Sequence, residues 1–242
     1  MLTIECAGKS DVGRRRSNNE DSLLIRPDLG FVAVADGVGG AAAGELASSI
    51  FVDAALGVFS GCPVLAGRPV SELIQKVYYV ANEKIVSEGR ENPNNRGMGC
   101  TAELLGFDEQ NYVVGHVGDS RTYLLRSGRL RQVTKDHSIV QEQVDKGLIT
   151  QAEAKVHSMR NVIMRAVGVN ETLAVDLIQG RGQPGDLFLL CSDGLTDMIE
   201  DEKIIEILSL TLDLRRKVDS LIESANLAGG YDNVTVALCR VV

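Results

Sequence analysis

The sequence lacks the features that mark membrane, secreted and nucleic-acid-binding proteins. No apolar run approaches the roughly 18 residues that span a bilayer, and residues 1–17 lack the apolar centre of a signal peptide. Positive charge is scarce, because 25 Lys and Arg stand against 33 Asp and Glu and give a net charge of −8. Such a balance repels a phosphate backbone. We therefore expect a cytoplasmic protein that neither inserts into a membrane nor binds nucleic acid.

Cysteine and histidine are too few and too scattered to indicate a zinc site. The chain has three histidines and five cysteines, with no C-x-x-C pair. The cysteines are Cys6, Cys62, Cys100, Cys191 and Cys239. An odd number without metal-type spacing predicts reduced, mostly buried thiols.

What the sequence does contain is typical of a globular protein with a sizeable core. Of its 242 residues, 44% are hydrophobic and 24% are charged. Low-complexity stretches, long linkers and repeats of the solenoid or propeller kind are absent from the sequence. We expect one domain over residues 1–242, in monomeric form.

Strand and helix signals do not alternate regularly along the chain. Runs of β-branched and aliphatic residues predict strands at 31–35, 112–117, 187–191 and 234–241. The turn dipeptide Ser127-Gly128 predicts a hairpin over 124–130 and therefore antiparallel pairing. Helices are expected at 45–59, from Ser71 onward with that serine as the cap, near 200–210 and at 214–227. The order predicts an α+β fold with antiparallel sheet. The polar segment 138–160 is expected to form a small helical flap on the side of the core.

Acidic side chains stand at the ends of several predicted strands. Asp36, Asp119, Asp193 and Asp232 flank strongly apolar runs and lie next to small residues that allow tight turns. One Asp-Gly pair alone is read as a simple turn. Four such positions, together with Glu20-Asp21, favour a cation, because carboxylates are costly to place against a core without one. Oxygen ligands without histidine suit Mg²⁺ or Mn²⁺.

Three consecutive arginines precede the Glu20-Asp21 pair. A guanidinium binds phosphate bidentately and supplies a fixed positive charge beside metals that bind the same group. Arg16 together with the acidic set therefore indicates phosphate-ester chemistry. For Arg14 and Arg15 we expect a solvated basic loop.

Five strings in this order resemble the motifs of metal-dependent protein phosphatases of type 2C, in the bacterial stand-alone serine/threonine branch. They are Arg16-Ser17-Asn18-Asn19-Glu20-Asp21, Asp36-Gly37-Val38-Gly39-Gly40, Gly118-Asp119-Ser120-Arg121, Ser192-Asp193-Gly194 and Asp232-Asn233-Val234-Thr235. The linking segments 133–138 and 161–166 also look like that branch. The resemblance extends from about residue 10 to the C-terminus.

The resemblance implies a β-sandwich of two antiparallel sheets flanked by helices, with a binuclear Mn²⁺ or Mg²⁺ centre at one end. By motif, Asp36 bridges both metals, and Asp193 and Asp232 complete one of them. The other is bound by the Gly37 carbonyl and, through water, by Glu20. The motifs further imply that Asp119 and Asp193 hold a third, weaker metal, that Asp21 orients water and that Arg16 binds the substrate phosphate.

The resemblance also implies the reaction and its partners. A metal-activated water attacks the phosphorus of phosphoserine or phosphothreonine in proteins, so that the enzyme opposes a bacterial Ser/Thr kinase. Flap residues 138–160 are expected to influence substrate choice, and Cys100 and Cys191 to be bystanders.

One position departs from the family pattern. Eukaryotic relatives carry a histidine after the Asp-Gly pair that protonates the leaving group, and here this position is Val38. The acid could be a metal-bound water near Asp119. Of the histidines, His116 is expected to be structural, His137 remains open and His157 is expected at the surface.

Two other functions compete with hydrolysis. Residues 37–42 match the dinucleotide fingerprint G-x-G-x-x-A, but Asp36 would repel a pyrophosphate and the antiparallel signals contradict a βαβ unit. A catalytically silent phosphatase fold that serves as a regulatory binding module is the other alternative.

Overall fold

Two antiparallel sheets lie face to face in the computed structural model, which describes residues 2–38, 43–61 and 69–242. One sheet has the order β1-β10-β9-β6-β7 and the other the order β2-β3-β4-β5-β8. The strands are β1 (Ile4–Asp11), β2 (Asp21–Arg26), β3 (Phe31–Val38), β4 (Gly99–Phe107), β5 (Asn111–Val117), β6 (Arg121–Arg126), β7 (Arg129–Gln132), β8 (Asp176–Arg181), β9 (Leu187–Cys191) and β10 (Val234–Val241). The predicted strands and the β6–β7 hairpin are confirmed.

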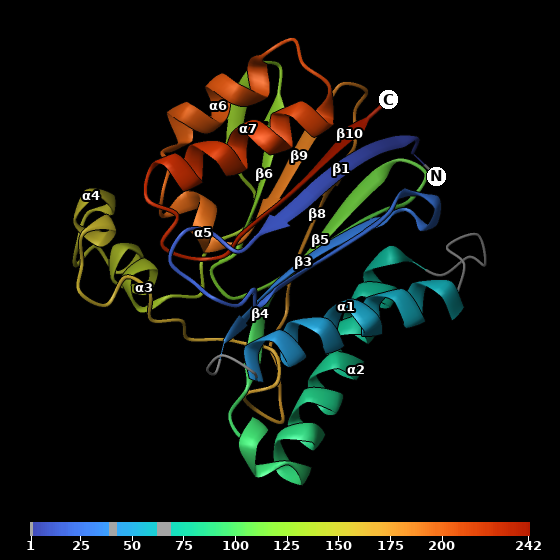
Figure 1. Ribbon diagram of the computed structural model, residues 1–242. Helices are drawn as coiled ribbons and strands as arrows, with labels where there is room; N and C mark the ends of the chain where they lie inside the picture. The colour runs from blue at the N-terminus through green and yellow to red at the C-terminus, as the bar shows by residue number, and fades with distance from the viewer. Residues whose placement is uncertain (1, 39–42, 62–68) are drawn as a thin grey trace.

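Helices cover both outer faces of this sandwich. They are α1 (Ala43–Gly61), α2 (Val70–Glu91), α3 (Ile139–Asp145), α4 (Gln151–Lys155), α5 (Asp193–Thr196), α6 (Asp201–Ser209) and α7 (Leu214–Leu227). Figure 1 shows α1 and α2 on one side, α6 and α7 on the other, and α3 and α4 projecting at one end. The predicted α+β sandwich is therefore confirmed. The expected cap at Ser71 is wrong, because the helix begins one residue earlier, at the buried Val70, with Pro69 as its N-cap.

Strand β3 explains why a continuous apolar run marks the centre of the fold. Side chains alternate between the two faces of a strand. Phe31 and Ala33 pack toward α1 and α2, whereas Val32 and Val34 pack between the sheets. Because both faces of β3 are buried, its apolar residues do not alternate with polar ones. Phe188 fills the space between the sheets, with its ring centroid 4.8 Å from that of Tyr112.

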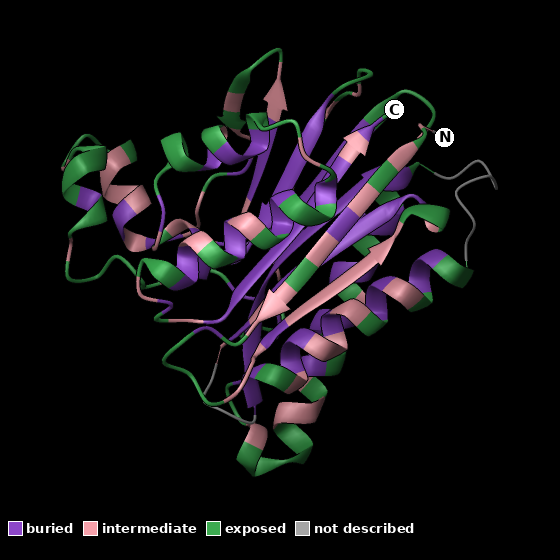
Figure 2. Ribbon diagram, turned by 45° about the horizontal axis from the view of Figure 1, so that its top comes forward, coloured by how far each residue is buried: buried purple, intermediate pink, exposed green. Residues whose placement is uncertain are grey.

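Helix α1 has the length and the composition of a membrane span, which the sequence analysis did not anticipate. Its mean hydropathy is 1.3, and about half of it is buried. Figure 2 shows a buried stripe along the side of α1 that faces the sheet. Phe51 on that side packs edge-on against Tyr78 of α2, with centroids 5.0 Å apart. In this structure α1 is a core helix.

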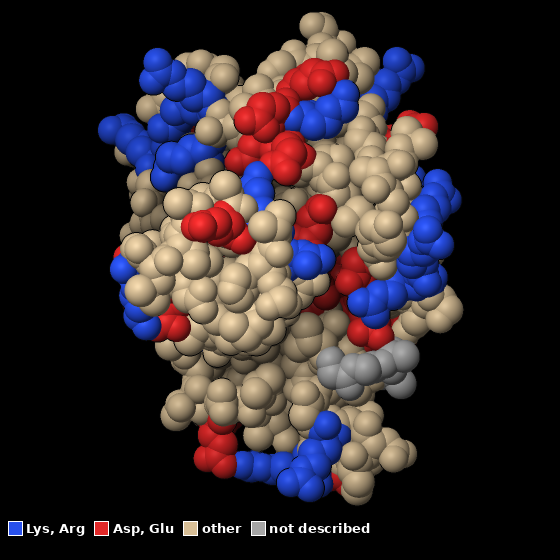
Figure 3. Space-filling view, turned by 90° about the vertical axis from the view of Figure 1, so that its left-hand side faces the viewer, with Lys and Arg blue, Asp and Glu red and all other residues tan. Residues whose placement is uncertain are grey.

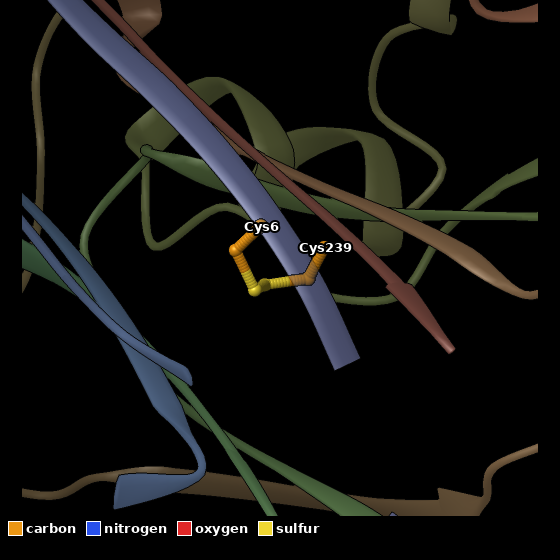
Figure 4. Close-up of a disulfide and its surroundings, with 2 residues drawn as sticks. All are labelled: Cys6 and Cys239. Carbon is orange, nitrogen blue, oxygen red and sulfur yellow. A yellow bond between two sulfur atoms is a disulfide. The ribbon is translucent and has the colours of Figure 1, made fainter. Parts of the chain in front are cut away.

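The expectation that the thiols are reduced is wrong for one pair. Cys6 and Cys239 form a disulfide between neighbouring strands β1 and β10 (Figure 4). The two residues are directly opposite in the antiparallel register, and their Cα atoms are 4.3 Å apart. The two cysteines are 233 residues apart in the sequence, so their spacing gave no indication that they pair. Cys100 and Cys191 are free and buried, as expected, and Cys62 lies outside the described residues.

The segment 138–160 forms two short helices at one end of the sandwich. Ser138 caps α3 by accepting a hydrogen bond from the Gln141 amide at 3.2 Å. Thr150 and Glu153 form a capping box at the start of α4. The base of the segment is tied to the sandwich, because the His137 amide donates to the Gly118 carbonyl at 2.7 Å.

Candidate metal and phosphate site

Four of the predicted metal ligands meet at one edge of the sandwich. Asp36 lies in β3, Asp119 follows β5, Asp193 follows β9 and Asp232 precedes β10. Strands β3 and β5 run in the same direction because both pair antiparallel with β4, and β9 ends beside the start of β10. Figure 3 looks onto this edge and shows acidic atoms inside a hollow, with basic side chains along its rim.

The carboxylates lie close enough to repel one another. Burial raises the pKa of Asp36 well above its usual value, and the charges of Asp21, Asp193 and Asp119 raise it further. The pKa of Asp193 is raised by burial first and by Asp119 next. Like charges near each other disfavour ionisation of the whole cluster. A divalent cation bound there removes this conflict.

Asp21 is held rigidly behind the cluster. It is the register partner of Asp36 in the β2–β3 pair and is 9% exposed. Its Oδ2 atom accepts hydrogen bonds from Ser192 Oγ at 2.8 Å and Thr235 Oγ1 at 2.6 Å. Burial raises its pKa to about 6. Its Oδ1 atom is buried and has no hydrogen-bond partner among the described residues.

The glycines beside two of these aspartates permit close packing. A Cβ atom on Gly37 would overlap the carbonyl oxygen of Gly44, and one on Gly194 would overlap the carbonyl oxygen of Asn233. Neither glycine has a positive φ. Gly37 lies within strand β3 and Gly194 within helix α5. Neither Asp-Gly pair is therefore a simple turn, which is the alternative to a metal site, and the glycines bring backbone segments together at the site.

Glu20 approaches the same edge through its backbone. Its carbonyl accepts hydrogen bonds from the Gly37 amide at 3.2 Å and from Ser48 Oγ at 2.6 Å. Its amide donates to Asn233 Oδ1 at 2.8 Å. Burial raises the pKa of its carboxyl group, and the charge of Asp232 acts in the same direction.

Arg16 supplies a positive charge to the acidic edge. Its Nη2 atom donates to Asp232 Oδ2 at 2.8 Å, and its side chain is 51% exposed. The hydrogen bond to Asp232 raises the pKa of Arg16, and the charges of Glu20 and Asp36 act in the same direction. The exposed part of the guanidinium can reach an anion in the hollow.

A cavity of about 290 Å³ separates the α3–α4 segment from this edge. Asp119 and Asp193 line it from the sandwich, and Arg160 and Lys155 line it from the other side. Burial raises the pKa of Asp119 to about 6, and the charge of Asp136 adds to the effect. An anionic group and a cation could both be accommodated there.

The ordered motifs, the sandwich and the acidic edge agree with a family comparison. The family model described as Protein phosphatase 2C matches residues 9–239. The chain belongs to the protein phosphatase 2C family. Expected membership in this family is therefore confirmed.

Relatives in this family include named bacterial serine/threonine phosphatases. The chain is 39% identical over 241 residues to the serine/threonine protein phosphatase PstP of Mycobacterium tuberculosis. This match covers all of this chain and 46% of PstP. The chain thus spans about half the length of that relative. Protein phosphatase PhpP of Streptococcus pneumoniae is 35% identical over 238 residues, covering 97% of this chain and 96% of PhpP.

Solved phosphatase structures have the same fold. The serine/threonine phosphatase PstP/Ppp of Mycobacterium tuberculosis superposes with a TM-score of 0.92 at 38% identity, and the match covers 99% of each chain. The catalytic domain of PstP in complex with two manganese ions gives a TM-score of 0.90 at 39% identity, with all of both chains covered. The dinucleotide alternative conflicts with these matches, and β3 pairs antiparallel with both β2 and β4. Residues 39–42 of that fingerprint lie outside the described residues.

The residues of this protein phosphatase 2C edge fit divalent metal ions. All candidate donors are oxygens, and the buried Asp21 Oδ1 lacks a partner in the part of the chain that the structure describes. Within the described ranges, no three His, Cys, Asp or Glu side chains converge as ligands for a single ion as they lie. Asp232 is turned to Arg16 instead. The repulsion among buried carboxylates supports a cation at this edge, and the individual ligand assignments remain predictions.

The histidines differ in their suitability as general acids. His116 is fully buried and contacts Glu103 through Nδ1 and the Lys135 carbonyl through Nε2. Its expected structural role agrees with these contacts. Burial, together with the neighbouring His116, lowers the pKa of His137 to about 4. His137 is therefore neutral at pH 7 and has no proton to donate as an imidazolium. His157 is half-buried on the segment that carries α4.

Sequence reasoning missed the residues that support the site. Asn233 accepts from the Glu20 amide and donates to the carbonyls of Val12 and Asn18 at 3.0 and 2.9 Å. It therefore links the arginine loop to the start of β10. Ser192 and Thr235 support Asp21 in a comparable way. In the sequence, each of these residues is only a polar side chain within or next to an apolar strand. Nothing in the residue spacing indicates which distant group it contacts.

Proposed function

We propose that this chain is a metal-dependent phosphatase that hydrolyses phosphoserine and phosphothreonine in proteins. The observation that carries the proposal is the grouping of mutually repulsive, mostly half-buried carboxylates beside Arg16 at one edge of a protein phosphatase 2C fold. The relatives are named serine/threonine phosphatases, and one solved relative contains two manganese ions. A silent binding module would not require the charged donors that this edge retains.

The proposed roles follow the positions of the residues. Asp36 lies at the centre of the repulsive set and would hold two cations, one of them together with Asp193 and Asp232. Glu20 and the Gly37 carbonyl would help to hold the other. Asp119 and Asp193 share the edge of the cavity and would hold a third, weaker cation. Divalent cations held there supply Lewis-acid chemistry that makes water nucleophilic near neutral pH.

The protein's own groups bind and orient the reactants. Arg16 binds the phosphate oxygens through its exposed guanidinium and offsets their charge in the transition state. Asp21 is fixed by Ser192 and Thr235, so its remaining carboxylate oxygen can orient water at the edge. Val38 provides no proton and His137 is neutral, so the leaving group takes its proton from solvent held at the site.

We further propose the setting in which this activity operates. Phosphorylated proteins require a Ser/Thr kinase to produce them, and the phosphatase opposes that enzyme. We propose a monomeric, cytoplasmic enzyme in which residues 1–242 form one catalytic domain and 138–160 form the flap. Light scattering of the purified chain tests whether it is monomeric, and cell fractionation tests whether it is cytoplasmic.

The direct test is hydrolysis by the purified chain. We expect Mn²⁺-dependent release of phosphate from para-nitrophenyl phosphate and from peptides that contain phosphothreonine or phosphoserine. A regulatory binding module would bind such peptides without releasing phosphate. Absence of turnover with both Mn²⁺ and Mg²⁺ would overturn the proposal.

Replacement of Arg16 by alanine is expected to raise KM for a phosphopeptide by about 10- to 100-fold, because a hydrogen bond to a charged group contributes about 1.5–3 kcal/mol. Arg26→Ala is the matched control, since Arg26 is paired with Asp28 away from the site. Steady-state kinetics and Mn²⁺ titration separate the two possible roles. Weaker Mn²⁺ affinity with an unchanged KM would contradict phosphate binding by Arg16.

Metal binding is expected to stabilise the folded chain. At a Mn²⁺ concentration of about 100 times Kd, linkage predicts roughly 2.7 kcal/mol. For a domain of this size that corresponds to a rise in Tm of about 5–10 °C. Thermal unfolding with Mn²⁺ and with EDTA measures the difference. The same rise in Asp36→Asn would show that the stabilising ion is bound elsewhere.

A further inference from the structure

The arginine loop lies directly against the start of β10. The Arg14 amide donates to the Gly230 carbonyl at 2.7 Å. Gly13 has a φ of +80°, and a Cβ atom there would overlap the carbonyl oxygen of Asp232. A side chain at Gly13 would thus push the loop away from the site. The backbone of the loop is therefore anchored, while the side chains of Arg14 and Arg15 are exposed, as expected for a solvated basic loop.

Arg14 and Arg15 are both exposed on this loop, and Arg15 lies beside an exposed aromatic ring. The guanidinium carbon of Arg15 lies 5.7 Å from the centroid of the Tyr231 ring, a distance typical of a cation–π contact. Tyr231 is 59% exposed. Neither Arg14 nor Arg15 forms an ion pair with any residue that the structure describes, whereas Arg16 is paired with Asp232.

The position of this group relates it to substrate. Arg15 directly precedes the proposed phosphate-binding Arg16, and Tyr231 directly precedes the proposed ligand Asp232. The group is therefore adjacent in the chain to Arg16 and Asp232 at the acidic edge, where Figure 3 shows basic atoms beside acidic ones. In a chain with a net charge of −8, Arg14 and Arg15 add two positive charges next to the proposed phosphate site.

We propose that Arg14, Arg15 and Tyr231 form a subsite for an Asp or Glu side chain that flanks the phosphorylated residue of a protein substrate. The inference rests on the proposed phosphatase function and adds the class of sequence that the enzyme prefers. Arg15 is held over the ring, so its guanidinium presents its free edge to a carboxylate with less loss of freedom than a mobile side chain. Arg14, whose backbone amide is bound to the Gly230 carbonyl, adds a second positive charge.

The test compares three matched phosphothreonine peptides. One has neutral flanks, one has glutamates within about four residues on the N-terminal side, and one has them on the C-terminal side, because four extended residues reach about 13 Å. The quantity measured is the ratio of kcat/KM for an acidic peptide to that for the neutral peptide, with Mn²⁺ present. We expect a ratio of about five for one of the two acidic peptides, since exposed charge pairs are individually modest.

Variants then assign the preference to the subsite. In the double variant Arg14→Gln/Arg15→Gln the ratio is expected to fall to about one, and in Tyr231→Leu to an intermediate value. Arg129→Gln is the matched control, because Arg129 is exposed and starts β7 at the far end of the β6–β7 hairpin. Its ratio is expected to equal that of the wild type. Raising the salt concentration should reduce the wild-type ratio by screening.

The outcomes separate the subsite from the proposed function. Hydrolysis of para-nitrophenyl phosphate and of all three peptides with ratios near one would overturn the subsite alone. A ratio that persists in the double variant would also overturn it. No hydrolysis of any substrate would overturn the proposed function together with the subsite.

Discussion

Asp36→Asn is expected to reduce kcat for phosphate hydrolysis on the order of 1000-fold. Asp36 lies at the centre of the carboxylates at this edge, and its pKa is raised by burial and by four neighbouring aspartates. An amide of the same shape removes the charge that is proposed to bridge two cations, and such cations contribute several kcal/mol to transition-state stabilisation. Asp193→Asn and Asp232→Asn are expected to have effects of similar size.

The fold of Asp36→Asn should remain intact, because the change removes one charge from a mutually repulsive set. Circular dichroism and thermal unfolding in EDTA test this. Asp28→Asn is the matched control, since Asp28 is exposed and paired with Arg26 on the same sheet. Wild-type turnover in Asp36→Asn would show that the bridging assignment is wrong.

His116→Ala is expected to destabilise the chain by about 3–5 kcal/mol, because it leaves the buried Glu103 without its partner. Both side chains are completely buried. Burial raises the pKa of Glu103. Burial alone would lower the pKa of His116, but the Glu103 carboxylate outweighs burial and raises it. Thr122 donates to the other Glu103 oxygen. Urea unfolding in EDTA measures the loss.

A double variant distinguishes the unpaired charge from the lost packing. Glu103→Leu/His116→Leu removes both charges and keeps apolar volume, so we expect it to be more stable than His116→Ala. Its stability should approach that of the wild type. If His116→Ala lost less than about 1 kcal/mol, or if the double variant lost as much as the two single changes together, the buried pair would not have the role assigned to it.

The sequence predicted the parts of the fold that depend on local pattern. Runs of β-branched and aliphatic residues correctly predicted strands, and the expected helix at 214–227 coincides with α7. The acidic positions were also recognisable, because carboxylates next to apolar strands are unusual and antiparallel topology then brings them to one edge. Ser71 was misassigned because its helix begins at Val70, where burial outweighs the cap preference.

The unpredicted features are contacts between distant residues. Cys6 and Cys239 are opposite each other only because β1 and β10 pair in one register. Glu103 and His116 meet across β4 and β5 with no spacing signal in the sequence. Arg15 and Tyr231 approach only because Gly13 lets the loop lie against Asp232. Such contacts are fixed by tertiary packing, which local propensity does not contain.

The central claim is that Asp36, Asp193 and Asp232 converge on divalent cations. The most direct measurement is an anomalous difference map from a crystal of this chain grown with Mn²⁺. We predict two manganese peaks that share the Asp36 carboxylate, one also coordinated by Asp193 and Asp232 and the other beside the Gly37 carbonyl. A map at full manganese concentration with no peak in contact with Asp36 would contradict the account.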